Sequence, residues 1–273
     1  MTAEEKISVL LDKDEYGFDD LVMIMEVLRS EQGCPWDREQ THKSIRKDLI
    51  EETYEVIEAI DTDDPVLLRE ELGDLLLQIV FHARIEEEKD TFDINDVAGD
   101  VCKKLIHRHP HVFGEVVVEN TDNVLSNWEK IKSEEKSRVT VTDKLRAIPP
   151  MLPALMRAEK VGKKAKCFDF ADSEEVMDKV CEELAELSEA VNEGSAEEIE
   201  EEIGDLLLTV TSLCRKLKID PELALSKATD KFIDRFEQVE GAVLSCGKDI
   251  DTVSNEELNR IWDENKHKNS KKN

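Results

Sequence analysis

Apolar residues recur along this chain every three or four positions, which is the spacing of an amphipathic helix. Strand signals are weak and confined to two short β-branched runs, residues 116–118 and 139–141. The pattern therefore predicts an all-α protein. The expected helices cover residues 20–32, 45–60, 65–86, 94–108, 123–135, 153–164, 174–192, 221–244 and 255–265, with one more that starts after Ser195.

The chain also contains an internal repeat. Residues 51–77 align without a gap on residues 182–208, and 12 of the 27 positions carry the same residue. Between the two copies, the segment IPPMLP at 148–153 holds three prolines, which interrupt a helix. The repeat therefore predicts two tandem helical-bundle domains, residues 1–148 and 149–273.

Each copy has its own signals for a helix–turn–helix. Asp64 followed by Pro65 provides an N-cap and a proline at the first helical position. In the second copy Gly194 can end the first helix, and Ser195 with Glu198 forms a capping-box pattern. Because Asp64 and Ser195 are equivalent positions of the repeat, the second helix is expected to start at the same place in both copies.

Two pairs of carboxylates in each copy share a helix face, because residues three apart lie on the same side of a helix. A rise of about 1.5 Å per residue places Glu55 level with Glu71 across an antiparallel turn, and Glu52 level with Asp74. We therefore expect four acidic side chains to converge between the two helices of each copy. The two sets are Glu52, Glu55, Glu71 and Asp74, and Glu183, Glu186, Glu202 and Asp205.

Four converging carboxylates repel one another, so they indicate a bound cation. Ligation by oxygen alone, without His or Cys, favours Mg²⁺, or Mn²⁺, over zinc. The alternative is a solvated acidic helix face, which a chain this rich in acidic residues could form without a metal. The same spacing in both copies argues against that alternative.

One glycine precedes the last carboxylate of each set. Gly73 and Gly204 lie inside otherwise strong helix patterns, where glycine costs about 1 kcal/mol against alanine. We expect the missing Cβ to let the facing helix or a bound ligand approach the backbone closely.

Charge and cysteine content narrow the classes of function. Of the 273 residues, 65 are Asp or Glu and 37 are Lys or Arg, which gives a formal net charge of −28. A nucleic acid polymer would be repelled by this charge, whereas a small anion held through a metal ion is compatible with it. The six cysteines form no Cys-x-x-Cys pair, and no apolar run approaches 18 residues. We therefore expect a cytoplasmic protein with free thiols and no membrane segment.

The order of several motifs resembles the two-domain MazG family of all-α nucleoside triphosphate pyrophosphohydrolases. The resemblance extends from about residue 18 to residue 267. Its motifs are GCPWD at 33–37, QTH at 40–42, EETYE at 51–55 with ELGD at 71–74, HPHVFG at 109–114, NWEKIK at 127–132, and EELAE at 182–186 with EIGD at 202–205.

This resemblance implies hydrolysis of nucleoside and deoxynucleoside triphosphates to the monophosphate and pyrophosphate. It also implies Mg²⁺ dependence, broad specificity, a homodimer and a housekeeping role in clearing aberrant nucleotides. Two alternatives stay open. One is a base-specific pyrophosphatase that acts on dUTP, dCTP or phosphoribosyl-ATP, and the other is a nucleotide-sensing module without turnover.

The resemblance further implies roles for single residues, with the second domain as the main catalytic one. Glu183, Glu186, Glu202 and Asp205 would hold the metal, and Glu182 would accept a proton from water. Lys231 and Arg235 would contact phosphate, with Trp262 on the base and Lys266 nearby. The first domain has comparable acids and the matching set Lys104, Arg108, Trp128 and Lys132.

Three other features are interpreted as structural. His107, His109 and His111 surround a proline, which favours a hydrogen-bonded turn over a zinc site. The lysines between 160 and 166 are expected to form a solvated helix face. The tail from about residue 267 is expected to be disordered.

Overall fold

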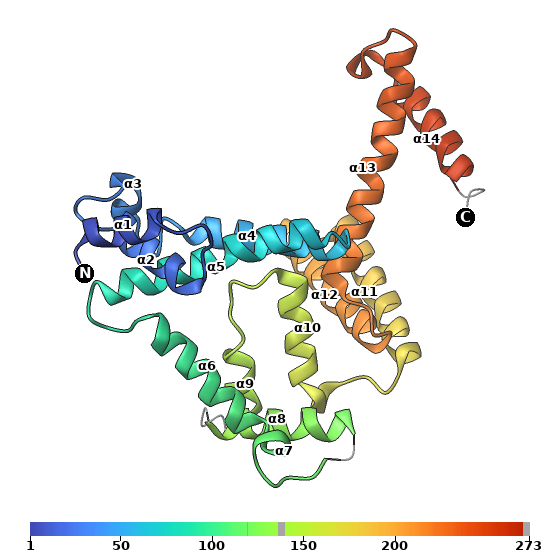
Figure 1. Cartoon of the computed structure of the whole chain (residues 1–273). Coiled ribbons are helices and arrows are strands. Elements are labelled where there is room, and N and C mark those ends of the chain that lie inside the picture. The colour runs from blue at the N-terminus through green and yellow to red at the C-terminus, as the bar shows by residue number, and fades with distance from the viewer. Residues whose placement is uncertain (119, 136–139, 270–273) are drawn as a thin grey trace. The chain divides into compact units, whose positions relative to one another are not determined.

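The computed structural model describes residues 1–269 apart from 119 and 136–139, and for 133 and 266–269 it describes the backbone alone. Helices and loops account for all of this described part, which confirms the all-α fold class (Figure 1). Neither β-branched run forms a strand there. Residues 116–118 lie in a loop and Val141 opens a helix, while Val139 is outside the described residues. In the tail, which the sequence predicts to be disordered from about 267, the backbone of residues 267–269 continues helix α14, and residues 270–273 lie outside the described part.

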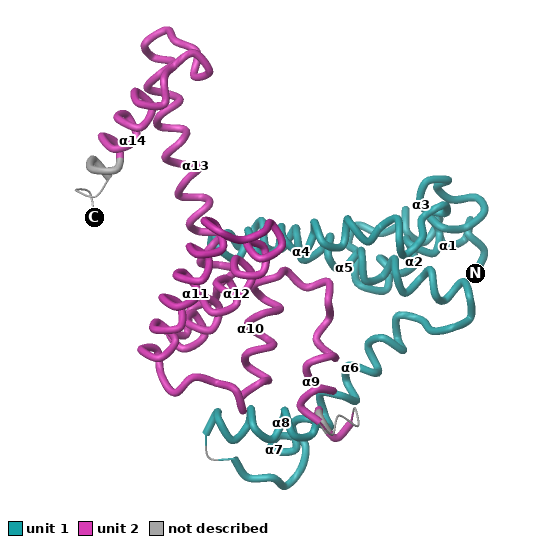
Figure 2. Tube along the Cα trace, turned by 180° about the vertical axis from the view of Figure 1, so that it is seen from behind, with its two compact units in different colours: residues 1–131 teal, residues 132–273 magenta. Residues whose placement is uncertain are grey.

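The chain divides into two compact units, residues 1–131 and 132–273, coloured separately in Figure 2. The first unit contains α1 (Ala3–Leu11), α2 (Phe18–Leu28), α3 (Pro35–Glu39), α4 (Arg46–Asp61), α5 (Pro65–Glu87), α6 (Ile94–Arg108), α7 (Pro110–Phe113) and most of α8 (Thr121–Glu135). The second contains α9 (Val141–Arg146), α10 (Ala154–Lys164), the 3₁₀ turn η1 (Lys166–Phe168), α11 (Ser173–Glu193), α12 (Ala196–Lys216), α13 (Pro221–Ser245), η2 (Ile250–Thr252) and α14 (Asn255–Asn269).

The repeat forms one helix pair in each unit, α4 with α5 and α11 with α12. The caps lie where the sequence predicts them. The Asp64 side chain accepts hydrogen bonds from the backbone N–H groups of Val66 and Leu67, at 2.9 and 3.1 Å. Ser195 and Glu198 form the reciprocal capping box. Each pair therefore begins its second helix at the equivalent residue, which fixes the height of the acidic side chains across the turn.

The core of the first unit lies where α2 and the C-terminal half of α5 meet the start of α4. Met25, Ile45 and Val80 are each 1% exposed and pack with Phe81 and Ile85. Ile57 on α4 and Leu76 on α5 lie nearer the acidic residues of this helix pair, and both are exposed to solvent. The helix pair is thus anchored at one end and largely open at the other.

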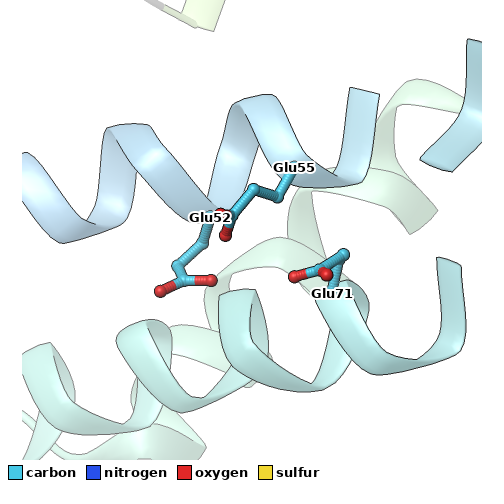
Figure 3. A group of neighbouring side chains, drawn as sticks. All are labelled: Glu52, Glu55 and Glu71. Atoms are coloured by element: carbon cyan, nitrogen blue, oxygen red, sulfur yellow. The ribbon is translucent and has the colours of Figure 1, made fainter. Parts of the chain in front are cut away.

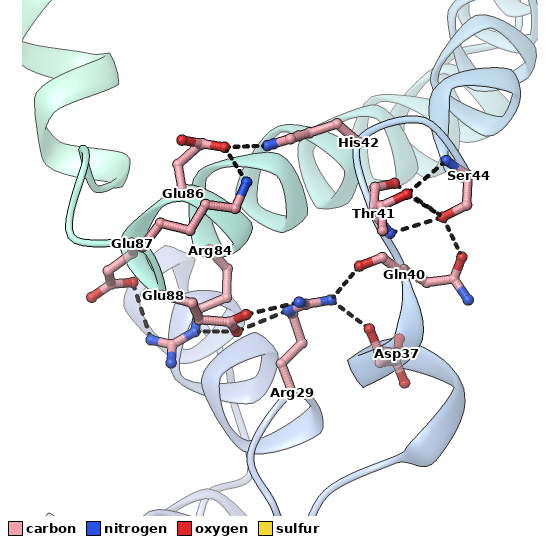
Figure 4. Close-up of polar contacts among 11 residues, drawn as sticks. Arg29, Asp37, Gln40, Thr41, His42, Ser44, Arg84, Glu86, Glu87 and Glu88 are labelled. Carbon is pink, nitrogen blue, oxygen red and sulfur yellow. Dashed lines mark hydrogen bonds and ion pairs between the residues drawn. The ribbon is translucent and has the colours of Figure 1, made fainter.

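The segment between α2 and α4 is fastened to the end of α5 by polar contacts (Figure 4). Arg29 donates two hydrogen bonds of 2.8 Å to the carboxylate of Glu88, and its guanidinium also reaches the backbone carbonyls of Asp37 and Gln40. Arg29 is 8% exposed, so its charge needs these partners. The motifs GCPWD and QTH therefore belong to a segment with a fixed position on α5.

A pair of histidines adds to the contacts between this segment and α5. The Nδ1 atoms of His42 and His82 lie 2.7 Å apart with stacked rings, and His42 Nε2 lies 2.5 Å from a carboxylate oxygen of Glu86. Contacts from Lys89, Thr91 and His42 lower the pKa of Glu86 to about 2. Burial, and then the charge of His42, lower the pKa of His82. The surroundings of His82 therefore favour its neutral form.

We expect His82→Leu to flatten the dependence of stability on acid pH. Because the pKa of His82 is lower in the folded chain, the unfolded chain binds more protons, and stability is lost as the pH falls below about 6.5. The leucine, which the second copy carries at the equivalent position 213, removes this term. Urea unfolding at pH 5.5 and 7.5 should show a smaller difference for His82→Leu than for the native chain. His111→Leu is the control, and an equal flattening there would contradict the assignment.

No helix in the described part of the chain is long and apolar enough to cross a membrane. All six cysteines lie within that part and are free thiols, as their scattered spacing predicts.

Candidate active site

The helix pair of the first unit brings three carboxylates together. Glu52 and Glu55 project from α4 toward Glu71 on α5 (Figure 3). One carboxylate oxygen from each lies within 4.8 Å of the other two, and all three side chains are partly buried. The two i,i+3 neighbours come from one helix and the third acid from the next, as the spacing predicts.

The second unit repeats this arrangement on α11 and α12. Glu183, Glu186 and Glu202 each place a carboxylate oxygen within 4.8 Å of the other two. Their burial differs, because Glu183 is only 5% exposed while Glu202 is partly buried and Glu186 is exposed. The second cluster therefore has a buried side and an open side.

The fourth acid of each set lies outside the 4.8 Å group. Asp74 and Asp205 are exposed, and an aspartate is one methylene shorter than a glutamate. Their charges still act on the clusters, since Asp74 contributes to the raised pKa of Glu71 and Asp205 to that of Glu202. The structure thus brings three of the four predicted ligands together in each unit and places the fourth beside them.

Burial and mutual repulsion raise the pKa values of carboxyl groups in both clusters. Burial, followed by the charge of Glu55, raises the pKa of Glu52 and of Glu71. Burial, followed by the charges of Glu186 and Glu183, raises the pKa of Glu202. A carboxylate with a raised pKa is a group that a cation would stabilise. These donor sets, which offer only oxygen, therefore fit Mg²⁺ or Mn²⁺.

We expect Mg²⁺ to raise the melting temperature of the chain more at pH 8 than at pH 5. The raised pKa of Glu202 means that the folded state loses stability as the pH rises from the unfolded value through the folded one. A bound cation offsets this loss, whereas protons compete with the metal at low pH. Thermal unfolding with Mg²⁺ and with EDTA at both pH values measures the effect. An equal shift at both pH values would argue against carboxylate ligation.

Lys179 lies beside the second cluster and is not among the residues predicted from the motifs. Its ammonium group lies 2.9 Å from Glu183 and 2.6 Å from Glu182, and these contacts raise the pKa of Lys179. The i,i+3 and i,i+4 spacing to the two acids would have identified it. The equivalent position of the first copy is Asp48. The second cluster therefore has a cation beside its buried acid where the first has an extra carboxylate.

The predicted phosphate and base contacts of the second unit lie on α13 and α14. Lys231 is exposed and Arg235 partly buried, one turn apart on α13. The Trp262 ring on α14 packs against Phe232, with ring centroids 5.2 Å apart, and these residues border an apolar pocket between the two helices. The side chain of Lys266 lies outside the described residues.

The corresponding residues of the first copy lie on α6 and α8, and Lys132 among them is the first residue of the second unit. The Arg108 guanidinium is buried and lies over the Trp128 ring, 5.2 Å from its centroid. Such a cation–π contact holds both side chains in place. Lys104 on α6 is exposed, and Lys132 on α8 is partly buried. In the same region His109 Nδ1 bonds to the carbonyl of Leu105, a structural hydrogen bond of the expected kind.

In the described part of the chain, no neighbouring helix lies close to the two glycines that precede the acids, Gly73 and Gly204. A Cβ added to Gly73 or Gly204 would have no heavy atom of the described structure within 4 Å, apart from its own helix backbone and chain neighbours. The expectation that the facing helix approaches there is wrong, because both glycines are exposed and their Cβ positions face open space. Close approach of a bound ligand, the other expected reason for these glycines, stays a prediction.

The helical units and their two acidic clusters define a class of all-α proteins with duplicated carboxylate sites between antiparallel helices. Such sites are suited to a divalent metal and, through it, to a phosphate-bearing ligand. Comparison with known proteins agrees. The family model described as the MazG nucleotide pyrophosphohydrolase domain matches residues 40–113 and 171–240, one segment on each copy of the repeat.

Relatives match over most of the chain. The nucleoside triphosphate pyrophosphohydrolase/pyrophosphatase MazG of Thermotoga maritima is 45% identical over 91% of this chain and 95% of its own length. The nucleoside triphosphate pyrophosphohydrolase of Escherichia coli K12 is 43% identical over 89% of this chain and 95% of its own. The chain belongs to the MazG family of nucleotide pyrophosphohydrolases. This membership confirms the resemblance drawn from the motifs, and with it the expected class of enzyme.

Proposed function

We propose that this protein hydrolyses nucleoside and deoxynucleoside triphosphates to the monophosphate and pyrophosphate, with Mg²⁺, or Mn²⁺ in its place. The observation that carries the proposal is the pair of compact carboxylate clusters in a chain of the MazG family. Broad base specificity follows from the apolar pocket at Trp262, because stacking recognises any base. The resulting role is clearance of aberrant nucleotides from the cellular pool.

Within this proposal the second unit is the main catalytic one. Glu183, Glu186, Glu202 and Asp205 are the residues that would hold the metal, which would neutralise the triphosphate charge and favour attack by water. Glu182 is 58% exposed at its side chain and borders the cluster, so it can accept the proton of the attacking water. The acids Glu52, Glu55, Glu71 and Asp74 would form a second, weaker site in the first unit.

Cationic side chains would complete the site. Lys179 already contacts the acidic cluster, so a triphosphate bound there would meet an ammonium group that can change partners from carboxylate to phosphate. Lys231 and Arg235, four apart on α13, would neutralise further phosphate oxygens. Trp262 would pack against the base, with Lys266 on the same helix. Lys104, Arg108, Trp128 and Lys132 are the equivalent candidates of the first unit.

A panel of nucleoside triphosphates incubated with Mg²⁺ tests the proposal, with products separated into pyrophosphate and phosphate. Pyrophosphate released from many bases is the expected result. Release from one base alone would establish the base-specific alternative, and tight binding without turnover would establish the sensor. Release of phosphate in place of pyrophosphate would contradict the proposed bond cleavage.

We also propose that the protein is a cytoplasmic homodimer that binds no nucleic acid polymer. The free thiols and the acidic charge support the compartment and the ligand class. The dimer is supported by apolar side chains that α11 and α12 leave exposed, among them Leu184, Ile203 and Leu207. A helix pair with such a surface gains stability by packing against a second copy.

A further inference from the structure

The second unit contains a pocket far along α12 from the acidic cluster. It lies where the end of α10 and the turn η1 meet the C-terminal end of α12 and the start of α13. Arg215 lines this pocket, 13 residues after Glu202 on the same helix, which corresponds to about 20 Å along the helix axis. The pocket is therefore separate from the carboxylate cluster.

Four cationic side chains line the pocket: Lys163, Lys166, Arg215 and Lys218. Lys163 and Lys166 are exposed, as a solvated helix face predicts, and they line the pocket together with the exposed Lys218, which follows α12. None of the three lysines forms an ion pair with any residue that the structure describes. Like charges gathered without partners repel, as the acids do in the clusters.

Three acidic residues, Glu159, Asp169 and Asp220, also line the pocket, and two of them have hydrogen-bond partners. Asp169 binds Arg215 through both carboxylate oxygens, at 2.5 and 2.9 Å, and Lys216 at 3.1 Å. Asp220 caps α13 by accepting a hydrogen bond from the backbone N–H of Leu223. Glu159 acts on Arg215, whose pKa is raised by the Asp169 hydrogen bonds and, to a smaller extent, by the charge of Glu159. With four cationic and three acidic side chains, the lining carries an excess of one positive charge.

The backbone holds Lys218 in place. It follows the end of α12 with φ of 59°, the left-handed conformation for which glycine or asparagine is preferred at such a position. The hydrogen bonds from Lys218 N to Arg215 O and from Ile219 N to Cys214 O form a Schellman motif around it. A lysine thus occupies a position that usually favours glycine, and its backbone is held at the pocket while its side chain is exposed.

We propose that this pocket is a second anion site, which binds a small phosphate-bearing ligand of the pyrophosphate class. Three ammonium groups can share the oxygens of such an ion, and the adjoining ion pair of Arg215 and Asp169 gives the pocket a rigid wall. The choice of pyrophosphate rests on the proposed function, which makes this anion at the carboxylate site. The pocket itself is independent of that function.

Calorimetric titration of the full chain with inorganic pyrophosphate in EDTA tests the proposal, because metal-dependent binding at the acids is then removed. The double variant Lys163→Ala/Lys218→Ala is expected to bind at least about tenfold more weakly, since hydrogen bonds to charged groups are among the strong ones. Lys160→Ala, on the same helix but not lining the pocket, should bind as the native chain does. Lys231→Ala should also leave this affinity unchanged.

Parallel titrations with inorganic phosphate and with ATP in EDTA distinguish a free product anion from the phosphate chain of a nucleotide. Equal weakening of ATP and pyrophosphate binding in the double variant would identify the shared phosphate chemistry. Absence of pyrophosphate binding to the native chain would overturn the proposal. So would a loss of binding in Lys231→Ala with none in the double variant, because the anion would then lie at the substrate residues. Activity with Mg²⁺ reports separately on the proposed function.

Discussion

Glu202→Gln is expected to lower kcat/KM for Mg²⁺-dependent triphosphate hydrolysis by about 100- to 1000-fold. A catalytic metal contributes several kcal/mol of charge stabilisation, and each 1.36 kcal/mol is tenfold in rate. Glutamine keeps the shape of the side chain but removes the charge that, with Glu183 and Glu186, makes the cluster a cation site. Steady-state kinetics with a pyrophosphate-coupled assay, at saturating and limiting Mg²⁺, measures the loss.

The matched control is Glu71→Gln, the same change at the equivalent position of the first unit. We expect it to leave most of the activity, because the second unit is proposed to carry catalysis. Neither change should lower the melting temperature without metal, since both remove a repelled carboxylate whose pKa is raised. A Glu202→Gln enzyme with normal activity would refute the assignment. A large loss in Glu71→Gln alone would move catalysis to the first unit.

The helix pairs and their acids could be predicted because their signals are local. Caps at Asp64 and Ser195 and the three-residue spacing of Glu183 and Glu186 are properties of single helices and one short turn. Four short α-helices were not predicted: α1, α3, α7 and α9. Helices α3 and α7 have only five and four residues, each opening with a proline. Helix α1 has a capping box at Thr2 and only nine residues, and α9 begins at Val141, inside a β-branched run that suggested a strand.

Contacts between distant segments could not be predicted in this way. His42 and His82 are 40 residues apart, and nothing in the local pattern of either indicates that their rings stack. The same holds for the pocket of Lys163 and Lys218, which depends on where α10 packs against α12. Lys179 is the intermediate case. Its spacing to Glu183 is local, but whether a lysine turns toward an acid or toward water depends on the burial of that acid.

The apolar surface of the helix pair α11 and α12 is the basis of the second large expected effect, which concerns the proposed homodimer. On α12, Ile203 is 44% exposed and Leu207 51%, one turn apart, while Leu184 on α11 is 57% exposed. Soluble helices normally bury such a stripe. Among the described residues of α11 and α12, Val176 is the one buried side chain that is apolar. This pair therefore lacks the buried apolar area that an independent bundle requires.

Leu207→Glu is expected to weaken the proposed homodimer by about 100-fold or more. An isologous interface loses the leucine twice, and each buried leucine is worth about 1.5–3 kcal/mol against 1.4 kcal/mol per tenfold in affinity. Light scattering after size-exclusion chromatography should show monomers at concentrations where the native chain is a dimer, with a parallel loss of melting temperature. Val117→Glu, at a residue 89% exposed in a loop of the first unit, is the control.

Activity in the Leu207 variant connects the two predictions. Glu202 and Leu207 lie on the same helix five residues apart, so loss of the surface that supports α12 should also loosen the acidic cluster. We therefore expect hydrolysis by Leu207→Glu to recover as its concentration rises and dimers form again by mass action. The Glu202→Gln enzyme should show no such recovery, because its defect is in the carboxylate set. A Leu207→Glu protein that stays dimeric and fully active would show that this apolar stripe is not the dimer surface.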